Sequence, residues 1–474
     1  MPMLFALLRS VAGIALRWFY SRIDVEGLEK IPSSTPVLLA VNHPNALVDA
    51  LVVAWISPRR MVFTARATLF SNPVFSAFFR AVGVVPLIRR QDIASLQSSG
   101  DVKRNERSFG ALNAALASGR AVMIFPEGVT GDRPSLAPLR SGAARIALDA
   151  RDSGVRRLAI VPIGLTFERK DAPRTRVLAQ VGDPIDVDSW ARVDDASDVA
   201  ALTAEIDRRL RAVTLNFETA DDVVRASALA SSFARLFRGV ESVPPVWRPH
   251  ASLSDEVSIT RRIEAARARL AEAPDDVRRR VDGLLLRLSR FNQTLAQHRL
   301  AIEDAEIALD PTAGAGFVLR EAPVFLVAGP FAFWGWLNHW LPFTLARAIA
   351  MRRIESAADP AMNTIVNGLG LVLLFYAAQA ALVWAILGPL AALLYLASLP
   401  VAADVNFYLQ ARLARATRRA RAYFLFRRRR TLQDELRAEL RWLRDEALSI
   451  DASLQPAGQG SRRIDTISTS GPAM

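Results

Sequence analysis

The residues best suited to acid–base chemistry stand in the stretch AVNHPNALVDALVV, residues 40–53. His43 follows an apolar run, and Asp49 stands six positions after it. A neutral imidazole can take a proton from a hydroxyl group near neutral pH, and a carboxylate beside it fixes the tautomer and stabilises the imidazolium. The pair predicts general-base chemistry, although a structural histidine at a strand end would leave the same two residues in the sequence.

The spacing of this pair says where each residue should lie. Side chains on one helix face repeat every three, four or seven residues, so a separation of six excludes a shared face. We expect His43 in a loop and Asp49 in the first turns of the following helix. The remaining histidines, His250, His298 and His339, follow no strand-like run with a carboxylate close behind.

Strand-like and helical stretches alternate over residues 21–220. Strands are expected at STPVLLAVNH, RRMVFTARATLF, VVPLI, RAVMIFPEG, RLAIVPIGLTF and TRVLAQVGDPIDV. Helices are expected at NALVDALVVAWI, NPVFSAFFRAVG, SFGALNAALASG and SGAARIALDARDSG. This alternation is typical of an α/β domain with a mostly parallel sheet flanked by helices. Residues 1–20 before it predict an amphipathic helix, which either packs on the protein's own core or lies on a membrane.

The rest of the chain divides into an Arg-rich part and an apolar part. Residues 221–315 predict two amphipathic helices broken near Pro274, with coiled-coil pairing. Residues 316–410 hold a first apolar stretch interrupted by proline, then a run from Ile365 to Ala403 without a charge. Since a membrane-spanning helix needs about 20 apolar residues, this run predicts a helical hairpin that turns at Gly388-Pro389.

Charge suggests how such a hairpin would be oriented. Residues 411–450 predict a basic helical region, and residues 451–474 predict a disordered tail. Basic residues flank both ends of the hairpin, so both ends and the α/β domain are expected in the cytoplasm, with the turn on the far side. A hairpin buried inside a soluble protein is the alternative, and the lack of a polar face argues against it.

The overall composition narrows the possible partners. The net charge is +13, which suits an anionic membrane surface or nucleic acid. Zinc-finger spacings and aromatic–basic RNA-binding stretches are absent from the sequence, so we expect lipid and no nucleic acid. The chain has no cysteine, which excludes thiolate catalysis and cysteine-ligated metal, and no metal site is expected.

Three further stretches add to the evidence of the His43 block. They are GVVPLIRR at 83–90, FPEGVTGDRPSLAPLRSG at 125–142 and IVPIGL at 160–165. With NHPNALVD, in this order and spacing, they resemble the four blocks of the glycerol-3-phosphate/1-acylglycerol-3-phosphate acyltransferase superfamily. The resemblance covers about residues 20–190.

The resemblance implies roles for particular residues. His43 would be the general base for the acceptor hydroxyl and Asp49 would orient it, so that the hydroxyl attacks the thioester directly. Arg89 would grip the acceptor's phosphate, to which a guanidinium can donate two parallel hydrogen bonds. The substrate-binding set implied by the resemblance is Asn42, Arg89, Glu127, Gly128, Arg140 and Pro162. Acyl-CoA or acyl carrier protein would donate the acyl group, with no other cofactor.

One departure bears on specificity. The widespread family motif has four residues between His and Asp, whereas five separate His43 from Asp49. A fungal-type glycerol-3-phosphate/dihydroxyacetone-phosphate acyltransferase branch has a similar longer spacing and membrane segments after its catalytic domain. The sequence therefore favours acyl transfer to glycerol 3-phosphate or a related acceptor in glycerophospholipid synthesis.

Other functions stay open at this point. Acylation of 1-acylglycerol 3-phosphate or remodelling of lysophospholipids is the first alternative, and a non-catalytic membrane adaptor with the same fold is the second. A lipid-cleaving serine hydrolase ranks low because the sequence has no Gly-x-Ser-x-Gly motif.

Overall fold

The computed structural model of the chain contains two compact units. Unit 1 comprises Met1–Val224, Ser252–Ser254 and Ala332–Asn406, and unit 2 comprises the remainder. The residues described are 2–57, 59–70, 76, 79, 83–87, 99–131, 133–170, 172–190, 195–237, 252–352 and 360–454. The helix predicted at 72–83 lies mostly outside these ranges, and Arg89 and the last twenty residues of the predicted tail lie wholly outside them.

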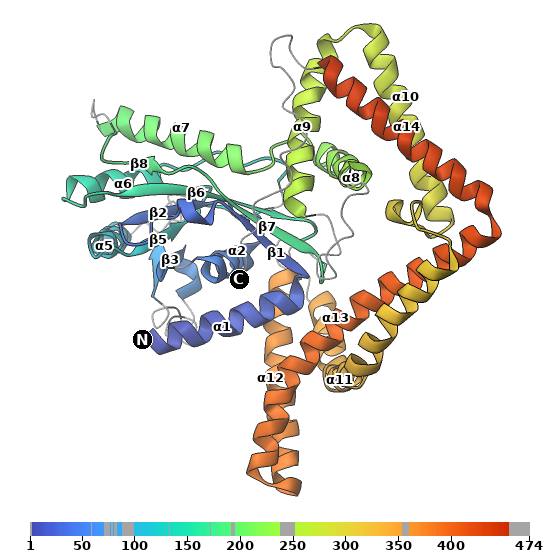
Figure 1. Cartoon of the computed structure of the whole chain (residues 1–474). Helices are drawn as coiled ribbons and strands as arrows, with labels where there is room; N and C mark the ends of the chain where they lie inside the picture. The colour runs from blue at the N-terminus through green and yellow to red at the C-terminus, as the bar shows by residue number, and fades with distance from the viewer. Residues whose placement is uncertain are drawn as a thin grey trace. The chain divides into compact units, whose positions relative to one another are not determined.

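Unit 1 contains an eight-stranded sheet (Figure 1). Its strands are β1 (Arg22–Glu26), β2 (Val37–Val41), β3 (Met61–Arg66), β4 (Val84–Leu87), β5 (Ala121–Ile124), β6 (Ala159–Phe167), β7 (Arg176–Val181) and β8 (Ile185–Asp186). The order is β1-β7-β6-β2-β5-β3-β4, and β8 also pairs with β6. All pairs are parallel except β6 with β7 and β6 with β8. The predicted mostly parallel α/β fold is confirmed.

Helices cover both faces of this sheet. They are α1 (Pro2–Phe19), α2 (Ala46–Ile56), α5 (Ser99–Ala117), α6 (Gly142–Asp152) and α7 (Asp195–Val213). Alternate residues of β2 point to opposite cores: Leu39 packs with residues of α1 and α2, and Leu38 packs with residues of α5, α6 and α7. A strand covered on both faces must be apolar throughout, which is why the whole of β2 is buried.

The N-terminal helix α1 lies against α2 within unit 1. Arg9 Nη2 donates to the carbonyl oxygen of Trp55 at 3.0 Å, and a Cβ built on Gly13 would lie 2.1 Å from the Trp55 ring. Leu16 is fully buried in the core below the sheet. Of the two interpretations left open by the sequence, packing on the protein's own core is therefore realised.

Three long helices carry the apolar sequence: α11 (Pro311–Arg352), α12 (Pro360–Leu387) and α13 (Pro389–Arg428). Each is long and apolar enough to cross a membrane, judged by length and composition. The predicted turn is confirmed, because α12 and α13 meet at Gly388, whose φ of 87° favours glycine. The predicted interruption of the first apolar stretch is wrong: α11 continues through its prolines, as apolar helices can when neighbouring groups satisfy the freed carbonyls.

Unit 2 contains the amphipathic helices that follow α8 (Ala220–Phe237). Two helices separated at Pro274 are confirmed, as α9 (Leu253–Glu272) and α10 (Asp275–Gln297). The long partner of α10 is α14 (Arg430–Leu454), with leucines of both helices in one core cluster. Arg280 Nε pairs with Glu446 at 2.8 Å beside this core. The pairing thus joins segments far apart in the sequence, which a local pattern could not show.

Candidate active site

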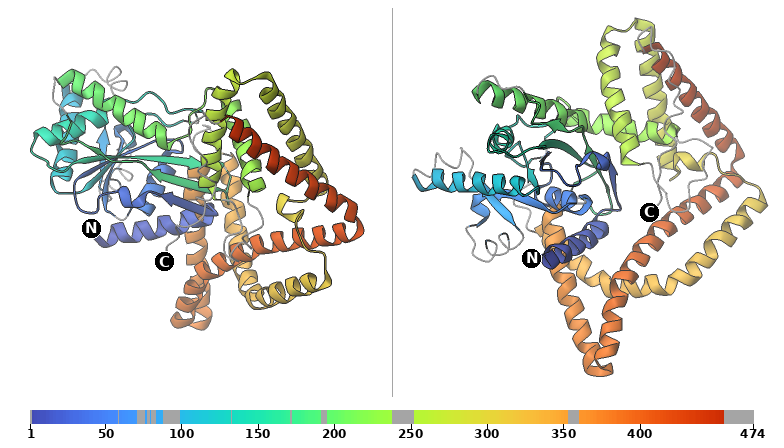
Figure 2. Two further views of the ribbon diagram at one scale, coloured as in Figure 1. Left: turned by 45° about the horizontal axis from the view of Figure 1, so that its top comes forward. Right: turned by 60° about the vertical axis from the view of Figure 1, so that its left-hand side comes forward.

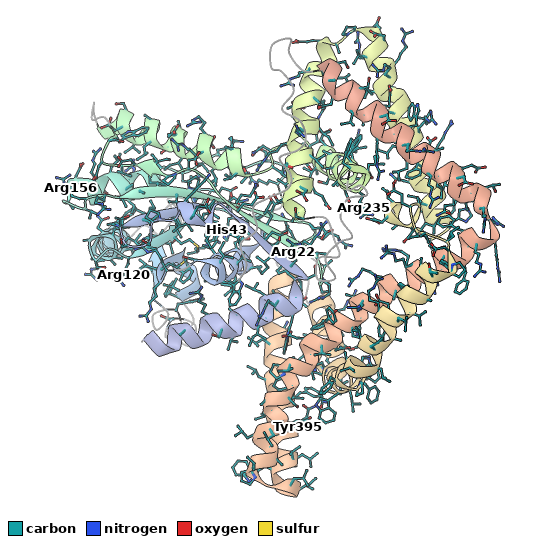
Figure 3. All side chains as sticks on the ribbon, in the orientation of Figure 1. Arg22, His43, Arg120, Arg156, Arg235 and Tyr395 are labelled. Atoms are coloured by element: carbon teal, nitrogen blue, oxygen red, sulfur yellow. The ribbon has the colours of Figure 1, made fainter. Side chains whose placement is uncertain are left out.

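The candidate site lies where two neighbouring parallel strands end. Ala40 of β2 is in register with Ile124 of β5, so Asn42-His43 and Phe125-Glu127 leave the same edge of the sheet. The carboxyl edge of a parallel sheet is where α/β proteins usually bind ligands, because loops and helix N-termini converge there. The sheet thus brings the first and third sequence blocks together, and Figure 3 shows His43 within the α/β domain.

His43 and Asp49 form a hydrogen-bonded dyad. His43 Nδ1 lies 2.9 Å from Asp49 Oδ2. The Asp49 side chain is completely buried, whereas the His43 side chain is 15% exposed. An ionised carboxylate can only accept, so Nδ1 carries the proton and Nε2 keeps its lone pair. No described residue forms a hydrogen bond with Nε2, which leaves this nitrogen available to a substrate hydroxyl.

The N-terminus of α2 accommodates the five-residue separation. His43 precedes the helix, Asn45 is its N-cap residue, and Asp49 lies in its first turn, as expected from the spacing. Ala46 has a φ of 48°, a left-handed conformation that is uncommon for alanine. The backbone N–H of Asn45 donates to Asp49 Oδ2 at 2.7 Å. The strained first residue therefore lets the helix turn the carboxylate back toward both Asn45 and His43.

Tyr20 supports this turn from the end of α1. Asn45 Nδ2 donates to Tyr20 Oη at 3.1 Å, and both side chains are almost completely buried. Burial and the negative charge of Asp49 raise the pKa of Tyr20, so its phenol stays neutral. Neither Tyr20 nor Asn45 was predicted from the sequence to be a site residue. Their contact joins residues 25 positions apart in different elements, and no spacing rule indicates it.

Glu127 fixes the loops on both sides of the histidine. Its Oε1 accepts from the backbone N–H of His43 at 2.8 Å, and its Oε2 accepts from the backbone N–H of Ala137 at 2.9 Å. The ring of Phe125 stacks on the imidazole, with 3.8 Å between centroids and 16° between planes. Residues of the FPEG block thus contact both the backbone and the ring of His43.

Burial sets the electrostatics of the dyad. It raises the pKa of Asp49, while the hydrogen bond from His43 acts in the opposite direction. Asp49 Oδ1 is buried and has no hydrogen-bond partner. A carboxylate held away from water with one oxygen unpaired is costly, and this cost favours transfer of positive charge onto the adjacent imidazole.

Three other predicted site residues lie in the segments that follow β2 and β5. Asn42 bonds Leu165 of β6 twice, accepting from its N–H at 2.7 Å and donating to its carbonyl oxygen at 3.1 Å. Gly128 has a φ of 65° in the turn after Glu127. The backbone N–H of Arg140 donates to Pro126 at 2.7 Å, and its side chain is exposed. These contacts place Asn42, Gly128 and Arg140 around the FPEG loop and the end of β2, while their contact with substrate stays a prediction.

Pro162 lies one strand away, in the middle of β6 opposite Ala40. On its other side β6 changes partner, from β8 at Ile160 to β7 at Ile163, so a missing backbone N–H is tolerated there. Arg89 falls outside the described residues. Among the described residues, no group of three or more His, Asp or Glu side chains could hold a metal ion.

Comparison with known proteins bears directly on this edge of the sheet. Residues 22–166, which include the dyad and Glu127, match the family described as Acyltransferase. These residues form an acyltransferase domain. The resemblance noted in the sequence is confirmed for this part of the chain.

The acyltransferase domain also resembles individual proteins. Over 188 residues it is 28% identical to a 1-acyl-sn-glycerol-3-phosphate acyltransferase of Cocos nucifera, a match covering 38% of this chain and 55% of the relative. Over 85 residues it is 38% identical to glycerol-3-phosphate O-acyltransferase 2 of Saccharomyces cerevisiae, a match covering 18% of this chain and 11% of the relative. The chain thus matches about half or less of the length of these relatives, and the yeast protein is consistent with the fungal-type branch.

A solved structure gives a weaker likeness. The crystal structure of the 1-acyl-sn-glycerophosphate acyltransferase from Thermotoga maritima covers 44% of this chain and 78% of its own, with 18% identity and a TM-score of 0.34.

Proposed function

We propose that the protein is a membrane-associated O-acyltransferase that moves a fatty acyl group from an acyl thioester to a hydroxyl of glycerol 3-phosphate or a related acceptor. The observation that carries this proposal is the His43–Asp49 dyad, with Nε2 of His43 uncommitted, inside a segment that matches the acyltransferase family. The acyl donor is acyl-CoA or acyl carrier protein, and the chemistry requires no further cofactor.

The reaction proceeds without an acyl-enzyme. His43 Nε2 takes the proton of the acceptor hydroxyl as its oxygen attacks the thioester carbonyl carbon. Asp49 stabilises the imidazolium, since its buried carboxylate bonds Nδ1. Collapse of the tetrahedral intermediate breaks the carbon–sulfur bond, and the thiolate leaves with the proton held on Nε2. The hydroxyl has then become an ester and the thioester has become a thiol.

The substrate contacts proposed from the family blocks complete the site. Arg89 binds the acceptor's phosphate, and Arg140 lies beside the FPEG turn through its backbone contact with Pro126. Asn42, Glu127, Gly128 and Pro162 shape the acceptor side, with Glu127 doing so through the loops that it holds. Anionic lipid attracts the basic end of α13, and the α/β domain faces the cytoplasm.

A panel assay tests the proposal. Purified full-length protein is offered acyl-CoA with glycerol 3-phosphate, dihydroxyacetone phosphate, 1-acylglycerol 3-phosphate and other lysophospholipids, and release of the thiol and formation of the ester are measured. Turnover of glycerol 3-phosphate or dihydroxyacetone phosphate supports the favoured acceptor class. Preference for 1-acylglycerol 3-phosphate would select the first alternative. No turnover with any acceptor, from folded protein and with either donor type, would leave the adaptor as the better explanation.

A further inference from the structure

The hairpin of α12 and α13 ends in an apolar tip. This tip projects away from the α/β domain of unit 1 (Figure 1 and Figure 2). The exposed apolar residues around its turn are Leu382, Trp384, Ile386, Leu387, Leu390, Leu393 and Leu394. No charged residue lies between Thr364 and Ala403. An exposed apolar surface of this extent marks contact with lipid or protein, and a turn that emerged into water would need polar side chains. The tip is therefore suited to hydrocarbon.

The uncharged part of α13 after the turn is shorter than a usual membrane span. Fifteen uncharged residues, 389–403, separate Gly388 from Asp404. They cover about 23 Å as a helix, whereas the hydrocarbon core is about 30 Å thick and a span needs about 17 residues or more. Asp404 is also fixed to the α/β domain, because its Oδ1 accepts from Trp18 Nε1 of α1 at 2.9 Å.

The start of α12 is likewise held by the α/β domain. Ile365 is 7% exposed and belongs to the core cluster that contains residues of α1 and α2. The first turns of α12 thus contact protein rather than lipid. On both helices the segment free to enter a membrane is shorter than the helix itself.

The helix α11 contacts both helices of the hairpin between the turn at Gly388 and the ends held by the α/β domain. Tyr395 of α13 donates to Asn338 at 2.6 Å, and the hydroxyl of Tyr376 of α12 lies 2.6 Å from Nε2 of His339. A Cβ on Gly335 would lie 2.1 Å from the carbonyl oxygen of Ala402, so the two backbones touch. Tyr395, Tyr376 and Ala402 are seven, twelve and fourteen residues from Gly388, or about 10, 18 and 21 Å along their helices.

Exposed aromatic side chains suit α11 to the boundary between lipid headgroups and acyl chains. Phe333, Trp336 and Trp340 are 61%, 43% and 55% exposed. Tryptophan is enriched at this boundary because its ring is apolar and its N–H is polar. With α11 at that level, the turn lies about 10 to 21 Å deeper, around the middle of a 30 Å core.

Within unit 2, an ion pair constrains the number of crossings. Arg412 Nε pairs with Glu321 Oε2 at 2.6 Å, and both side chains are largely buried. The start of α11 and the basic part of α13 therefore lie on one side of the membrane. If all three apolar helices crossed the membrane, Glu321 and Arg412 would lie on opposite sides of it.

From these contacts we infer that the hairpin is a wedge in one leaflet. It enters and leaves the membrane on the same side, with Gly388 in the hydrocarbon and the aromatic face of α11 at the headgroup boundary. The partner of this surface is a single lipid leaflet. This arrangement differs from the crossing hairpin that composition alone predicts, and it does not depend on the proposed chemistry.

Labelling of single cysteines tests the inference, because the full-length chain has none of its own. Leu387→Cys places a thiol at the tip, and Ala414→Cys places one after the ion-paired Arg412. A membrane-impermeant maleimide is added to sealed membranes of both orientations. We expect Ala414→Cys to react from one face and Leu387→Cys to react only after detergent is added. Reaction of Leu387→Cys from the opposite face would show a crossing hairpin, and reaction from the same face would show that the tip does not insert.

A depth measurement separates the wedge from a crossing hairpin whose tip stays shielded. Leu387→Cys and the matched control Leu374→Cys, both well exposed on the same hairpin, are labelled with an environment-sensitive fluorophore in reconstituted full-length protein. Quenching is compared between lipids spin-labelled near the headgroup and deep in the chain. The wedge requires deep quenching at 387 and shallow quenching at 374. A crossing hairpin would reverse this order, since Trp384 and the tip would then reach the far boundary.

Discussion

The surroundings of His43 and His339 differ in what they leave the imidazole free to do. Nδ1 of His43 bonds a buried carboxylate, and its Nε2 has no partner among the described residues. His339 is 1% exposed and uses both nitrogens, Nδ1 with the carbonyl oxygen of Gly335 at 2.8 Å and Nε2 with Tyr376. The His43 side chain is 15% exposed, whereas His339 is buried. Only the first combines a free nitrogen, access from solvent and a carboxylate, which are the requirements of a general base.

Replacing each histidine by alanine is the sharpest test of this contrast. His43→Ala should lower turnover by roughly 10²- to 10⁴-fold, the usual contribution of a general base, and should also lower the melting temperature moderately because the buried Asp49 loses one hydrogen-bond partner. His339→Ala should lower the melting temperature without lowering turnover per folded molecule, because Tyr376 loses its partner in the apolar bundle while the His43–Asp49 pair is unchanged. Turnover per folded molecule and thermal melts are measured for both variants. A folded His43→Ala protein with nearly normal turnover would remove the proposed mechanism.

Asp49→Asn should separate activity from stability at the same site. The amide can favour the wrong imidazole tautomer, so turnover should fall by roughly 10²-fold or more. Burial raises the pKa of Asp49, which means that the folded state holds the ionised carboxylate at a cost near neutral pH. The variant should therefore melt at the same or a higher temperature at pH 7.

The sign of the pH dependence follows from that shift. Wild-type protein gains stability as the pH falls toward the raised pKa of Asp49, because the folded state then binds a proton more readily than the unfolded state. Asparagine does not titrate, so the difference in melting temperature between variant and wild type should narrow in acid. A difference that widens as the pH falls would contradict the electrostatic account.

Sequence reasoning succeeded where chemistry and topology are local. The positions of His43 and Asp49 followed from their spacing, and Glu127 came close to them because parallel strands end at one edge. It failed for Tyr20, whose hydroxyl reaches Asn45 only after α1 has packed on α2. The continuous course of α11 was missed for another reason: rules for proline derived in water penalise a helix that apolar surroundings tolerate.

Arg89 tests whether the acceptor side extends as the sequence predicts. If its guanidinium binds the acceptor's phosphate, Arg89→Ala should raise the KM for the acceptor by about 10- to 100-fold, the value of a charge-assisted hydrogen bond of about 1.5–3 kcal/mol, with little change for the donor. Arg90→Ala is the matched control, because the strand-like pattern of the sequence predicts an extended segment, in which adjacent side chains point to opposite faces. Equal effects of the two substitutions would indicate a general basic patch rather than a phosphate site.

The smallest expected effect concerns the support of the dyad from α1. Tyr20→Phe and Asn45→Ala each remove the 3.1 Å bond between Asn45 Nδ2 and Tyr20 Oη, while the backbone N–H of Asn45 can still donate to Asp49. Each should lower stability by about 1 kcal/mol and turnover by a few-fold, since the carboxylate is less firmly held.

If both act through this one bond, the double variant should lose no more than the larger single loss. Additive losses would mean that the two side chains support the site independently. A lower melting temperature with unchanged turnover and an unchanged pH profile of kcat/KM would limit Tyr20 to a structural role.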